Sequence, residues 1–131
     1  MIPPYQAGVA ELDWREWGII RDIDDQGLCG CCYAFSTAHS LESVNGIKSG
    51  EVREISEQHH VDCCDSIGCG GCNGGDMRFL VDWLKDSGTY TLTDYPYTSG
   101  TSGVEGTCTT TGLTAIDPTE VVVSKTNWVT K

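Results

Sequence analysis

A cysteine at the start of a helical pattern is the residue in this chain best suited to covalent chemistry. Cys32 lies in a glycine-rich turn, residues 26–36, and apolar residues follow it at helical spacing. Lys48, Ser49 and Gly50 then close the pattern with a basic residue and a helix breaker, so we expect a helix that begins near Cys32. The apolar positions are Ala34, Ala38, Leu41, Val44 and Ile47. Because unpaired N–H groups at a helix N-terminus stabilise thiolate over thiol, the pattern predicts a cysteine nucleophile that attacks carbonyl carbons.

Length and charge limit the class of protein. With 131 residues, the chain suffices for one domain or for part of one. Nineteen acidic against eight basic residues give a net charge of -11, which repels phosphate backbones and anionic membrane surfaces. We therefore expect no nucleic-acid and no membrane partner. No apolar run reaches the roughly 20 residues of a membrane span, and residues 1–4 lack the basic and apolar regions of a signal peptide. If the protein is secreted, we expect its signal and any pro-segment to have been removed or omitted.

Two more segments show helix signals. Ser56 can cap a short helical turn over residues 57–61, which leads into a cysteine- and glycine-rich loop, residues 63–75, without regular structure. Asp76 can cap a second clear helix, which Gly88 ends. The apolar stripe of this second helix, expected in the core, consists of Met77, Leu80, Val81 and Leu84.

We interpret the remaining segments as mostly irregular. Residues 5–20 are expected to be extended, with Trp14 and Trp17 as buried aromatics. Residues 98–106 are expected to form an exposed loop. The best strand candidate, residues 120–123, stands near the end of the sequence, so its strand partners are missing or supplied from elsewhere.

Eight cysteines in 131 residues favour an oxidising compartment over the cytosol. Their spacing does not fix the connectivity, and two other uses of the thiols stay open. Cys29 and Cys32 form a C-x-x-C pair at a helix start, typical of thioredoxin-type redox enzymes, although the pattern lacks the alternating strands and helices of that fold. Together with Cys69 and Cys72 they could bind a structural zinc, although the interval between the pairs is longer than in common zinc ribbons. A thiol count and a metal assay separate these alternatives.

Several motifs, in order along the chain, resemble those of papain-like cysteine peptidases. The resemblance covers most of residues 12–108 and begins with Asp-Trp-Arg at 13–15 and the turn around Cys32. It continues with Ser-Glu-Gln at 56–58, Val-Asp-Cys at 61–63, Gly-Cys-Asn-Gly-Gly at 71–75 and Tyr-Pro-Tyr at 95–97. The adjacent Cys63 and Cys64, followed by Cys69 and Cys72, are similar to a loop of cathepsin B. Several motifs in register are far more specific than one.

This resemblance implies an α+β, papain-like fold, of which the chain holds the N-terminal half of the mature enzyme. Residues 1–111 would form the mainly helical left half, and residues 112–131 the start of the strand-rich, barrel-like right half. The implied function is cysteine-type proteolysis of a peptide or protein substrate, without a cofactor, in a lysosome or outside the cell. Endopeptidase action is expected, and the motifs present are also compatible with an exopeptidase.

The resemblance also assigns roles to individual residues. Cys32 would be the nucleophile, and the side-chain amide of Gln26 would donate to the oxyanion together with the backbone N–H of the nucleophile. Asp76 could favour basic substrate side chains, but its position before a helix makes capping the better hypothesis. The bare backbone of a Gly-Gly pair lets an extended peptide pair alongside. The implied substrate-binding residues are Gly30, Gly74, Gly75 and Met77.

Three disulfides are implied by the resemblance, and they leave two thiols. The implied pairs are Cys29 with Cys72, Cys63 with Cys108, and Cys64 with Cys69. Cys31 stands where a serine is commoner in the family, and we interpret it as a passive replacement. A disulfide between Cys31 and Cys32 would be strained, because neighbouring Cα atoms are about 3.8 Å apart and disulfides usually need roughly 4.4 to 6.8 Å.

The predicted site lacks a suitably placed histidine to protonate the leaving amine. Of the three histidines, His39 lies about 10 Å along the helix from Cys32, and the family has no catalytic group where His59 and His60 stand. The family carries its catalytic histidine and asparagine in the second half. We therefore expect the chain alone not to cleave peptides and to need the remaining C-terminal half of the enzyme. The alternative is a non-catalytic half-domain that binds peptides or a partner through the exposed cleft wall.

Overall fold

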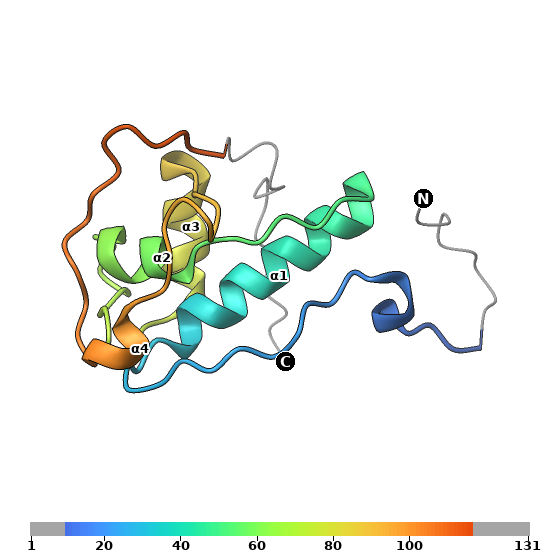
Figure 1. Ribbon diagram of the computed structural model, residues 1–131, viewed down its shortest axis with the longest axis horizontal. Helices are drawn as coiled ribbons and strands as arrows, with labels where there is room; N and C mark the ends of the chain where they lie inside the picture. The colour runs from blue at the N-terminus through green and yellow to red at the C-terminus, as the bar shows by residue number, and fades with distance from the viewer. Residues whose placement is uncertain (1–9, 117–131) are drawn as a thin grey trace.

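The computed structural model describes residues 10–116, which form a mainly helical unit around one long helix (Figure 1). Its helical elements are η1 (a 3-10 helix, Trp14–Trp17), α1 (Cys32–Ser49), α2 (Glu57–Cys63), α3 (Met77–Ser87) and α4 (Ser99–Ser102). Strand pairing within the described range is limited to isolated bridges, such as Gly30 with Asn73. The strand candidate at 120–123 lies outside the described residues. Among residues 10–116, no helix combines the length and the apolar character that crossing a membrane requires.

Helix α1 begins and ends where the sequence predicts. After its last residue, Ser49, Gly50 takes a left-handed conformation with φ 81° and donates its N–H to the Gly46 carbonyl at 2.9 Å. The predicted apolar positions divide along the helix, because those in the first half are buried and those in the second half are exposed. Buried are Ala34, Ala38 and Leu41, and exposed are Val44 and Ile47.

Capping side chains set the starts of α2 and α3, as predicted. Ser56 Oγ accepts a hydrogen bond from the backbone N–H of His59 at 3.0 Å. Asp76 Oδ1 accepts one from the backbone N–H of Arg78 at 2.9 Å. Helix α2 continues to Cys63, further than the predicted end at residue 61.

The apolar stripe of α3 is only partly in the core. Leu80 and Leu84 are buried and Val81 is half-buried, as the core prediction requires. The prediction is wrong for Met77, which is 50% exposed. Met77 is the first residue of α3 and follows the glycine-rich loop, so the neighbouring residues cover only half of its side chain.

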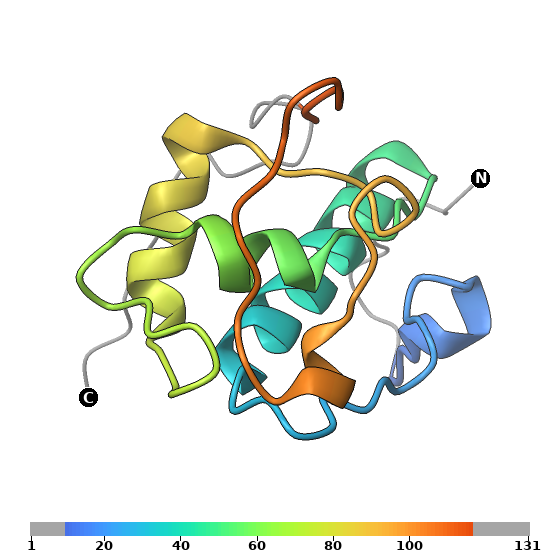
Figure 2. The ribbon, with the colours of Figure 1, turned by 60° about the vertical axis from the view of Figure 1, so that its left-hand side comes forward.

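The core lies where α1 meets the two shorter helices. Both α2 and α3 pack beside the N-terminal part of α1 (Figures 1 and 2). Ile55, Val61 and Leu80 fill the space between them, and each is at most 3% exposed. Burying a side chain of this size stabilises the fold by about 1.5 to 3 kcal/mol. The helix that carries Cys32 is therefore anchored at its N-terminal end.

The entry segment differs from the expectation of an extended chain with buried aromatics. Asp13 accepts a hydrogen bond from the backbone N–H of Arg15 at 2.9 Å and so caps the 3-10 turn η1. Trp17 is 42% exposed. The reason is position, since η1 lies at the end of the molecule away from α2 and α3 (Figure 1).

The predicted loop at residues 98–106 contains the short helix α4. Gln58 of α2 holds its start, because the Gln58 Oε1 atom accepts hydrogen bonds from the backbone N–H groups of Thr98 and Ser99 at 2.8 and 2.9 Å. Ser99 is buried, whereas Ser102 is exposed. A buried amide far away in sequence therefore orders a segment that has only loop signals of its own.

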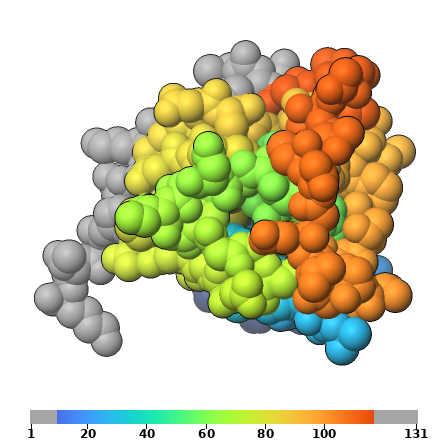
Figure 3. All heavy atoms as spheres, turned by 90° about the vertical axis from the view of Figure 1, so that its left-hand side faces the viewer, coloured from blue at the N-terminus to red at the C-terminus, as the bar shows by residue number. Residues whose placement is uncertain are grey.

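Three disulfides cross-link the loops. The structure pairs Cys29 with Cys72, Cys63 with Cys108, and Cys64 with Cys69, the pairing that the resemblance implied. The second of these joins the last residue of α2 to the segment after α4. Figure 3 shows the loop after α2 and the segment after α4 side by side on one face. Each such cross-link typically contributes about 2 to 4 kcal/mol.

Candidate active site

Cys32 stands at the N-terminus of α1 with an exposed thiol. The carbonyl of Cys31 accepts the first helical hydrogen bonds, from Ala34 N at 2.9 Å and Phe35 N at 3.3 Å. The backbone N–H of Cys32 is therefore in the first turn, where N–H groups have no partner inside the helix. The thiol lies at a cavity of about 340 Å³, which Gln26 and His39 also line.

Gln26 supplies an amide to the same cavity. Its Nε2 atom donates a hydrogen bond to the Cys29 carbonyl at 2.9 Å, which fixes the side chain across the turn. An amide nitrogen carries two N–H groups, so this bond leaves one for a further acceptor. The structure thus brings together two residues that the sequence analysis assigned to nucleophile and oxyanion donor.

Contacts with two other segments hold the turn between Gln26 and Cys32. The backbone N–H of Leu28 donates to the Gly100 carbonyl of α4 at 2.9 Å. Gly27 has φ 61° and approaches Gly100 so closely that a Cβ atom would lie 2.4 Å from the Gly100 oxygen. At the other end, Gly30 N donates to the Cys72 carbonyl at 2.9 Å, beside the disulfide from Cys29.

The glycine-rich loop lies next to this turn. Gly30 and Asn73 form a parallel bridge, which leads into Gly74 and Gly75. A Cβ atom on Gly75 would lie 2.9 Å from the ring of Tyr33, so this position has no room for a side chain. The Tyr33 hydroxyl donates to the Gly71 carbonyl at 2.9 Å, and burial raises the pKa of Tyr33 to about 12. The loop is thereby fixed to the first turn of α1.

Asp76 and Met77 take different roles. The carboxylate of Asp76 caps α3 and also pairs with the side chain of Arg78. These hydrogen bonds from Arg78 lower the pKa of Asp76. The capping hypothesis therefore fits the structure better than an acidic substrate contact. Met77 leaves half of its side chain accessible beside the Gly-Gly pair.

His39 borders the cavity, although the sequence analysis set it aside. It follows Cys32 by two helical turns, a spacing that returns a side chain to the same face. Its Nε2 atom lies 3.0 Å from Asp24 Oδ2 and 2.8 Å from Arg21 Nη2. Among the described residues, no hydrogen bond joins His39 to Cys32. The ring is part of an ionic cluster instead.

His59 and His60 lie away from the cavity and are buried in the core. They are 3% and 0% exposed, and burial lowers the pKa of His59 to about 4 and that of His60 to about 3. Both rings are therefore neutral near pH 7. No described histidine is placed to form an ion pair with Cys32.

The ionic cluster around Arg21 resembles a metal site in its donor atoms but already holds a cation. Ligand atoms of Asp24, His39 and Glu57 lie within 4.8 Å of one another. The Arg21 Nη2 atom is 2.6 Å from Asp24, 2.8 Å from Glu57 and 2.8 Å from His39. Glu42 adds a contact to Arg21 Nε at 3.1 Å. The guanidinium thus occupies the position that an ion would take.

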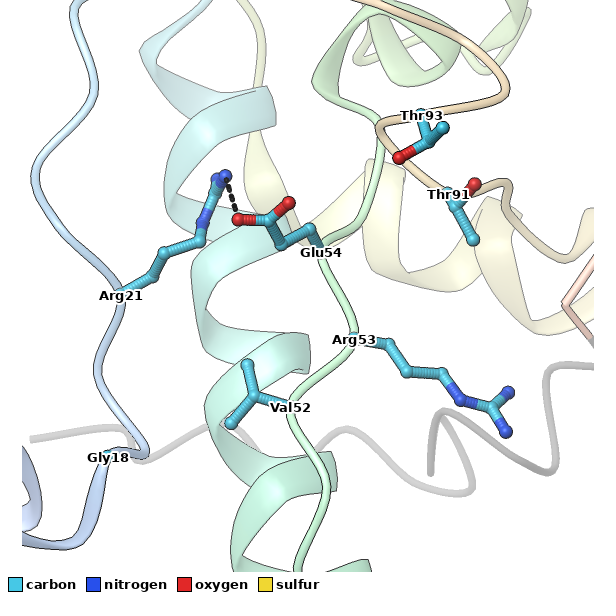
Figure 4. Close-up of a pocket in the computed structure, with 7 residues that line it drawn as sticks. All are labelled: Gly18, Arg21, Val52, Arg53, Glu54, Thr91 and Thr93. Atoms are coloured by element: carbon cyan, nitrogen blue, oxygen red, sulfur yellow. Dashed lines mark ion pairs between the residues drawn. The ribbon is translucent and has the colours of Figure 1, made fainter.

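A second cavity, of about 490 Å³, lies on the other side of Arg21 (Figure 4). Figure 4 shows the Arg21 side chain directed toward Glu54, with 3.6 Å between the charged atoms. Thr91 and Thr93 lie on the opposite side of this cavity. Its lining contains no thiol and no imidazole, so we do not assign the reaction to it.

The disulfides decide between the alternative uses of the thiols. Cys29, Cys69 and Cys72 are bonded to other cysteines, so they are not available as zinc ligands in this structure. The redox pair is likewise incomplete, because Cys29 is bonded to Cys72 and not to Cys32.

Comparisons with known proteins identify the family of the chain. A profile of the papain family cysteine proteases matches residues 9–129. The chain is 43% identical over 99 residues to a thiol protease of Hemerocallis and 41% identical over 100 residues to a KDEL-tailed cysteine endopeptidase of Arabidopsis thaliana. Each alignment covers 76% of this chain and 26% of the relative, so the chain spans about a quarter of the length of these relatives.

A solved structure of bromelain from Ananas comosus, in complex with the inhibitor E64, superposes with a TM-score of 0.68 at 32% identity. The match covers 79% of this chain and 46% of bromelain. The described helices therefore have the arrangement found in the helical half of such proteases. With the family profile covering most of its length, this chain belongs to the papain family of cysteine proteases.

Proposed function

We propose that this chain supplies the nucleophile and one oxyanion donor of a cysteine peptidase. The observation that carries the proposal is the shared cavity of the exposed Cys32 thiol and the Gln26 amide at the start of α1. The sulfur of Cys32 would bond to the substrate carbonyl carbon while the π electrons move to the oxygen. Gln26 and the backbone N–H of Cys32 would donate to that oxygen.

A peptide substrate would lie along the glycine-rich loop. Gly74 and Gly75 offer backbone without side chains, and the Tyr33 ring beneath Gly75 keeps that backbone in place. Gly30 would border the scissile bond, and the exposed Met77 would contact an apolar substrate side chain. An extended peptide can pair with such a backbone as an added strand.

Breaking the C–N bond requires a proton for the leaving nitrogen. We propose that a histidine in the remaining C-terminal half of the enzyme supplies this proton. His39 is held by Arg21 and Asp24, and the other two histidines are buried. The division into a left half, residues 1–111, and the start of a right half, residues 112–131, is part of this proposal. Ile20 and Ile23, exposed beside the cavity, offer an apolar surface for the remaining half.

The three disulfides support a location in the secretory pathway, because such bonds persist in oxidising compartments. Within it, we propose a lysosomal or extracellular site of action with endopeptidase activity.

Peptide hydrolysis by two preparations tests the proposal. Protein purified from its natural source is compared with recombinant residues 1–131, using a fluorogenic peptide. We expect turnover by the source protein and none by residues 1–131. In the active protein Cys32→Ala should abolish turnover, whereas Ser40→Ala, an exposed change on the same helix, should leave it unchanged. Turnover that survives Cys32→Ala contradicts the nucleophile, and Cys32-dependent turnover by residues 1–131 contradicts the division into halves.

A further inference from the structure

The hydroxyl of Tyr97 contacts both ends of the turn that leads to Cys32. Tyr97 Oη donates a hydrogen bond to the Gln26 carbonyl at 2.6 Å. The same atom lies 3.2 Å from the sulfur of Cys31, the residue directly before Cys32. One side chain therefore joins the residue that carries the oxyanion amide to the residue that precedes the nucleophile.

Counting protons assigns the direction of these hydrogen bonds. A tyrosine hydroxyl has one proton, and the Gln26 carbonyl can only accept, so the Tyr97 proton points to Gln26. The contact with Cys31 must then use the thiol proton, with Tyr97 Oη as acceptor. Cys31 is 0% exposed, and burial raises the pKa of its thiol, so the proton is retained. The result is a chain of two hydrogen bonds, from thiol to hydroxyl to carbonyl.

Neighbouring groups fix the ring of Tyr97. It packs edge-to-face on Phe35 of α1, with ring centroids 4.9 Å apart. On another side lies Gly100 of α4, where a Cβ atom would be 2.8 Å from the ring. Phe35 is on the first turn after Cys32, so the hydroxyl is held relative to the helix that carries the nucleophile.

We propose that Tyr97 and Cys31 are positioning residues that set where the Gln26 amide stands relative to the Cys32 sulfur. The inference rests on the proposed function and gives Cys31 a role, as hydrogen-bond donor to Tyr97, in place of a passive serine replacement. We assign neither side chain a contact with substrate. Removing an oxyanion donor outright lowers the reaction rate about 10²- to 10³-fold. Displacing the donor weakens the same stabilisation of the oxyanion and should therefore also lower the rate.

Reversible addition to a peptide aldehyde measures this positioning without a leaving group. The Cys32 sulfur bonds to the aldehyde carbon, the π electrons move to the oxygen, and that oxygen takes the thiol proton. An acyl-dipeptide aldehyde with ¹³C at the aldehyde carbon is titrated into residues 1–131 and followed by NMR. The signal gives both the dissociation constant and the ratio of the two diastereomers of the adduct.

Four variants separate positioning from general stability. Tyr97→Phe removes the hydroxyl and keeps the ring on Phe35, and Cys31→Ala removes the thiol donor. We expect each to raise the dissociation constant roughly tenfold, less than loss of the whole donor, and to increase the minor diastereomer. Cys31→Ser restores a donor and should remain near the unmodified chain. Tyr95→Phe is the matched control, because it removes the other hydroxyl of the same Tyr-Pro-Tyr turn. The Tyr95 hydroxyl donates a hydrogen bond to Asp62 at 2.9 Å and not to Gln26.

The outcomes distinguish this inference from the proposed function. If neither residues 1–131 nor the source protein forms an adduct at Cys32, the proposed function fails and the inference fails with it. If only the source protein forms the adduct, the same four variants are compared in that protein. If the unmodified chain and both Tyr97→Phe and Cys31→Ala bind alike, the inference alone is overturned. An equal loss in Tyr95→Phe also overturns it. Hydrogen exchange at the Leu28 and Gly30 amides gives a second readout, and we expect it to accelerate in Cys31→Ala but not in Cys31→Ser.

Discussion

The imidazole of His60 meets the hydroxyl of Thr89 in the core, with 3.0 Å between Nε2 and Oγ1. The other ring nitrogen, Nδ1, has no hydrogen-bond partner among residues 10–116. The adjacent His59 also has an Nδ1 atom without a partner in that range, and its ring packs among Trp83, Tyr90 and Tyr95. A proton on the Nδ1 atom of His59 would therefore be buried without an acceptor among these residues.

The environment of this pair opposes protonation. Burial and, to a smaller extent, the nearby His59 lower the pKa of His60 to about 3, whereas the Ala34 backbone acts to raise it. Burial likewise lowers the pKa of His59 to about 4, against the attraction of Asp62. Because both folded-state pKa values lie below the ordinary histidine value of 6.5, the unfolded chain binds more protons in acid. Stability contributed by the neutral rings is complete above pH 6.5 and falls as pH decreases below it.

His60→Leu should reduce the acid sensitivity of the fold. From about pH 7.5 to pH 5, each buried neutral histidine lowers the free energy of unfolding by roughly 2 kcal/mol. The variant removes the contribution of one of the two histidines. Urea unfolding of the chain at both pH values measures the difference. Thr89→Val is the control, since it removes the hydrogen bond to His60 but keeps the titrating ring. An equal pH difference in His60→Leu and in the unmodified chain would contradict the prediction.

The same experiment bears on the two proposed locations. Burial raises the pKa of Glu42 and of Glu57, so these groups take up protons in the folded state and add stability as pH falls toward 4.5. As pH falls, the histidines thus lower the stability of the fold and the glutamates raise it. A net loss of stability in acid would favour the extracellular location over the lysosomal one.

Local signals in the sequence predict the helix starts because each depends on neighbouring residues. Ser56 and Asp76 cap helices through hydrogen bonds to residues two or three positions later, and Gly50 ends α1 in the same local way. The position of Cys32 at a helix N-terminus follows from such signals. The disulfide partners do not, since they were implied by the family resemblance and not by spacing.

Contacts between distant segments could not be predicted in this way. The Tyr97 hydroxyl meets Gln26 across 71 positions of sequence, and neither residue carries a pattern that indicates the other. Gln58 orders α4 in the same manner, so loop composition at residues 98–106 was misleading. The exposure of Trp17 likewise depends on where η1 lies relative to the helices, which its own sequence does not encode.

Arg21→Met should destabilise the fold strongly. The Arg21 side chain is 13% exposed and neutralises Glu42 and Glu57, whose side chains are 1% and 2% exposed. Without the guanidinium these buried carboxylates lose the cation that neutralises them, although Glu42 keeps the hydrogen bond from Ile55 N at 2.6 Å. We therefore expect a loss of about 3 to 5 kcal/mol near neutral pH. Thermal unfolding measures it.

Glu54→Gln is the matched control for this prediction. Glu54 also pairs with Arg21, at 3.6 Å, but its side chain is 55% exposed. Exposed ion pairs contribute at most about 1 kcal/mol, so we expect a small change. Similar losses in the two variants would show that burial of the carboxylates is not the source of the effect.

Alkylation should distinguish the two free thiols. Cys32 is exposed, whereas Cys31 is buried and donates to Tyr97. Iodoacetamide added to the native chain should therefore modify Cys32 alone, and Cys31 should react only after unfolding. Peptide mapping without reduction identifies the modified residue and leaves the three disulfides intact. Protection of both thiols would instead indicate a bond between Cys31 and Cys32, and equal labelling would contradict the burial of Cys31.

Ser56→Ala should destabilise the chain more than an ordinary serine substitution. Ser56 is 0% exposed, and its Oγ atom accepts from His59 N at 3.0 Å and donates to the Tyr95 carbonyl at 2.6 Å. The variant removes the cap of α2 and leaves a buried carbonyl without a donor, so we expect a loss of roughly 1 to 3 kcal/mol in urea unfolding. Ser40→Ala, at an exposed position inside α1, should be neutral or slightly stabilising because alanine is the better helix former. If both variants unfold at the same urea concentration, the double role of Ser56 is wrong, and the contact between α2 and the Tyr-Pro-Tyr turn must depend on other groups.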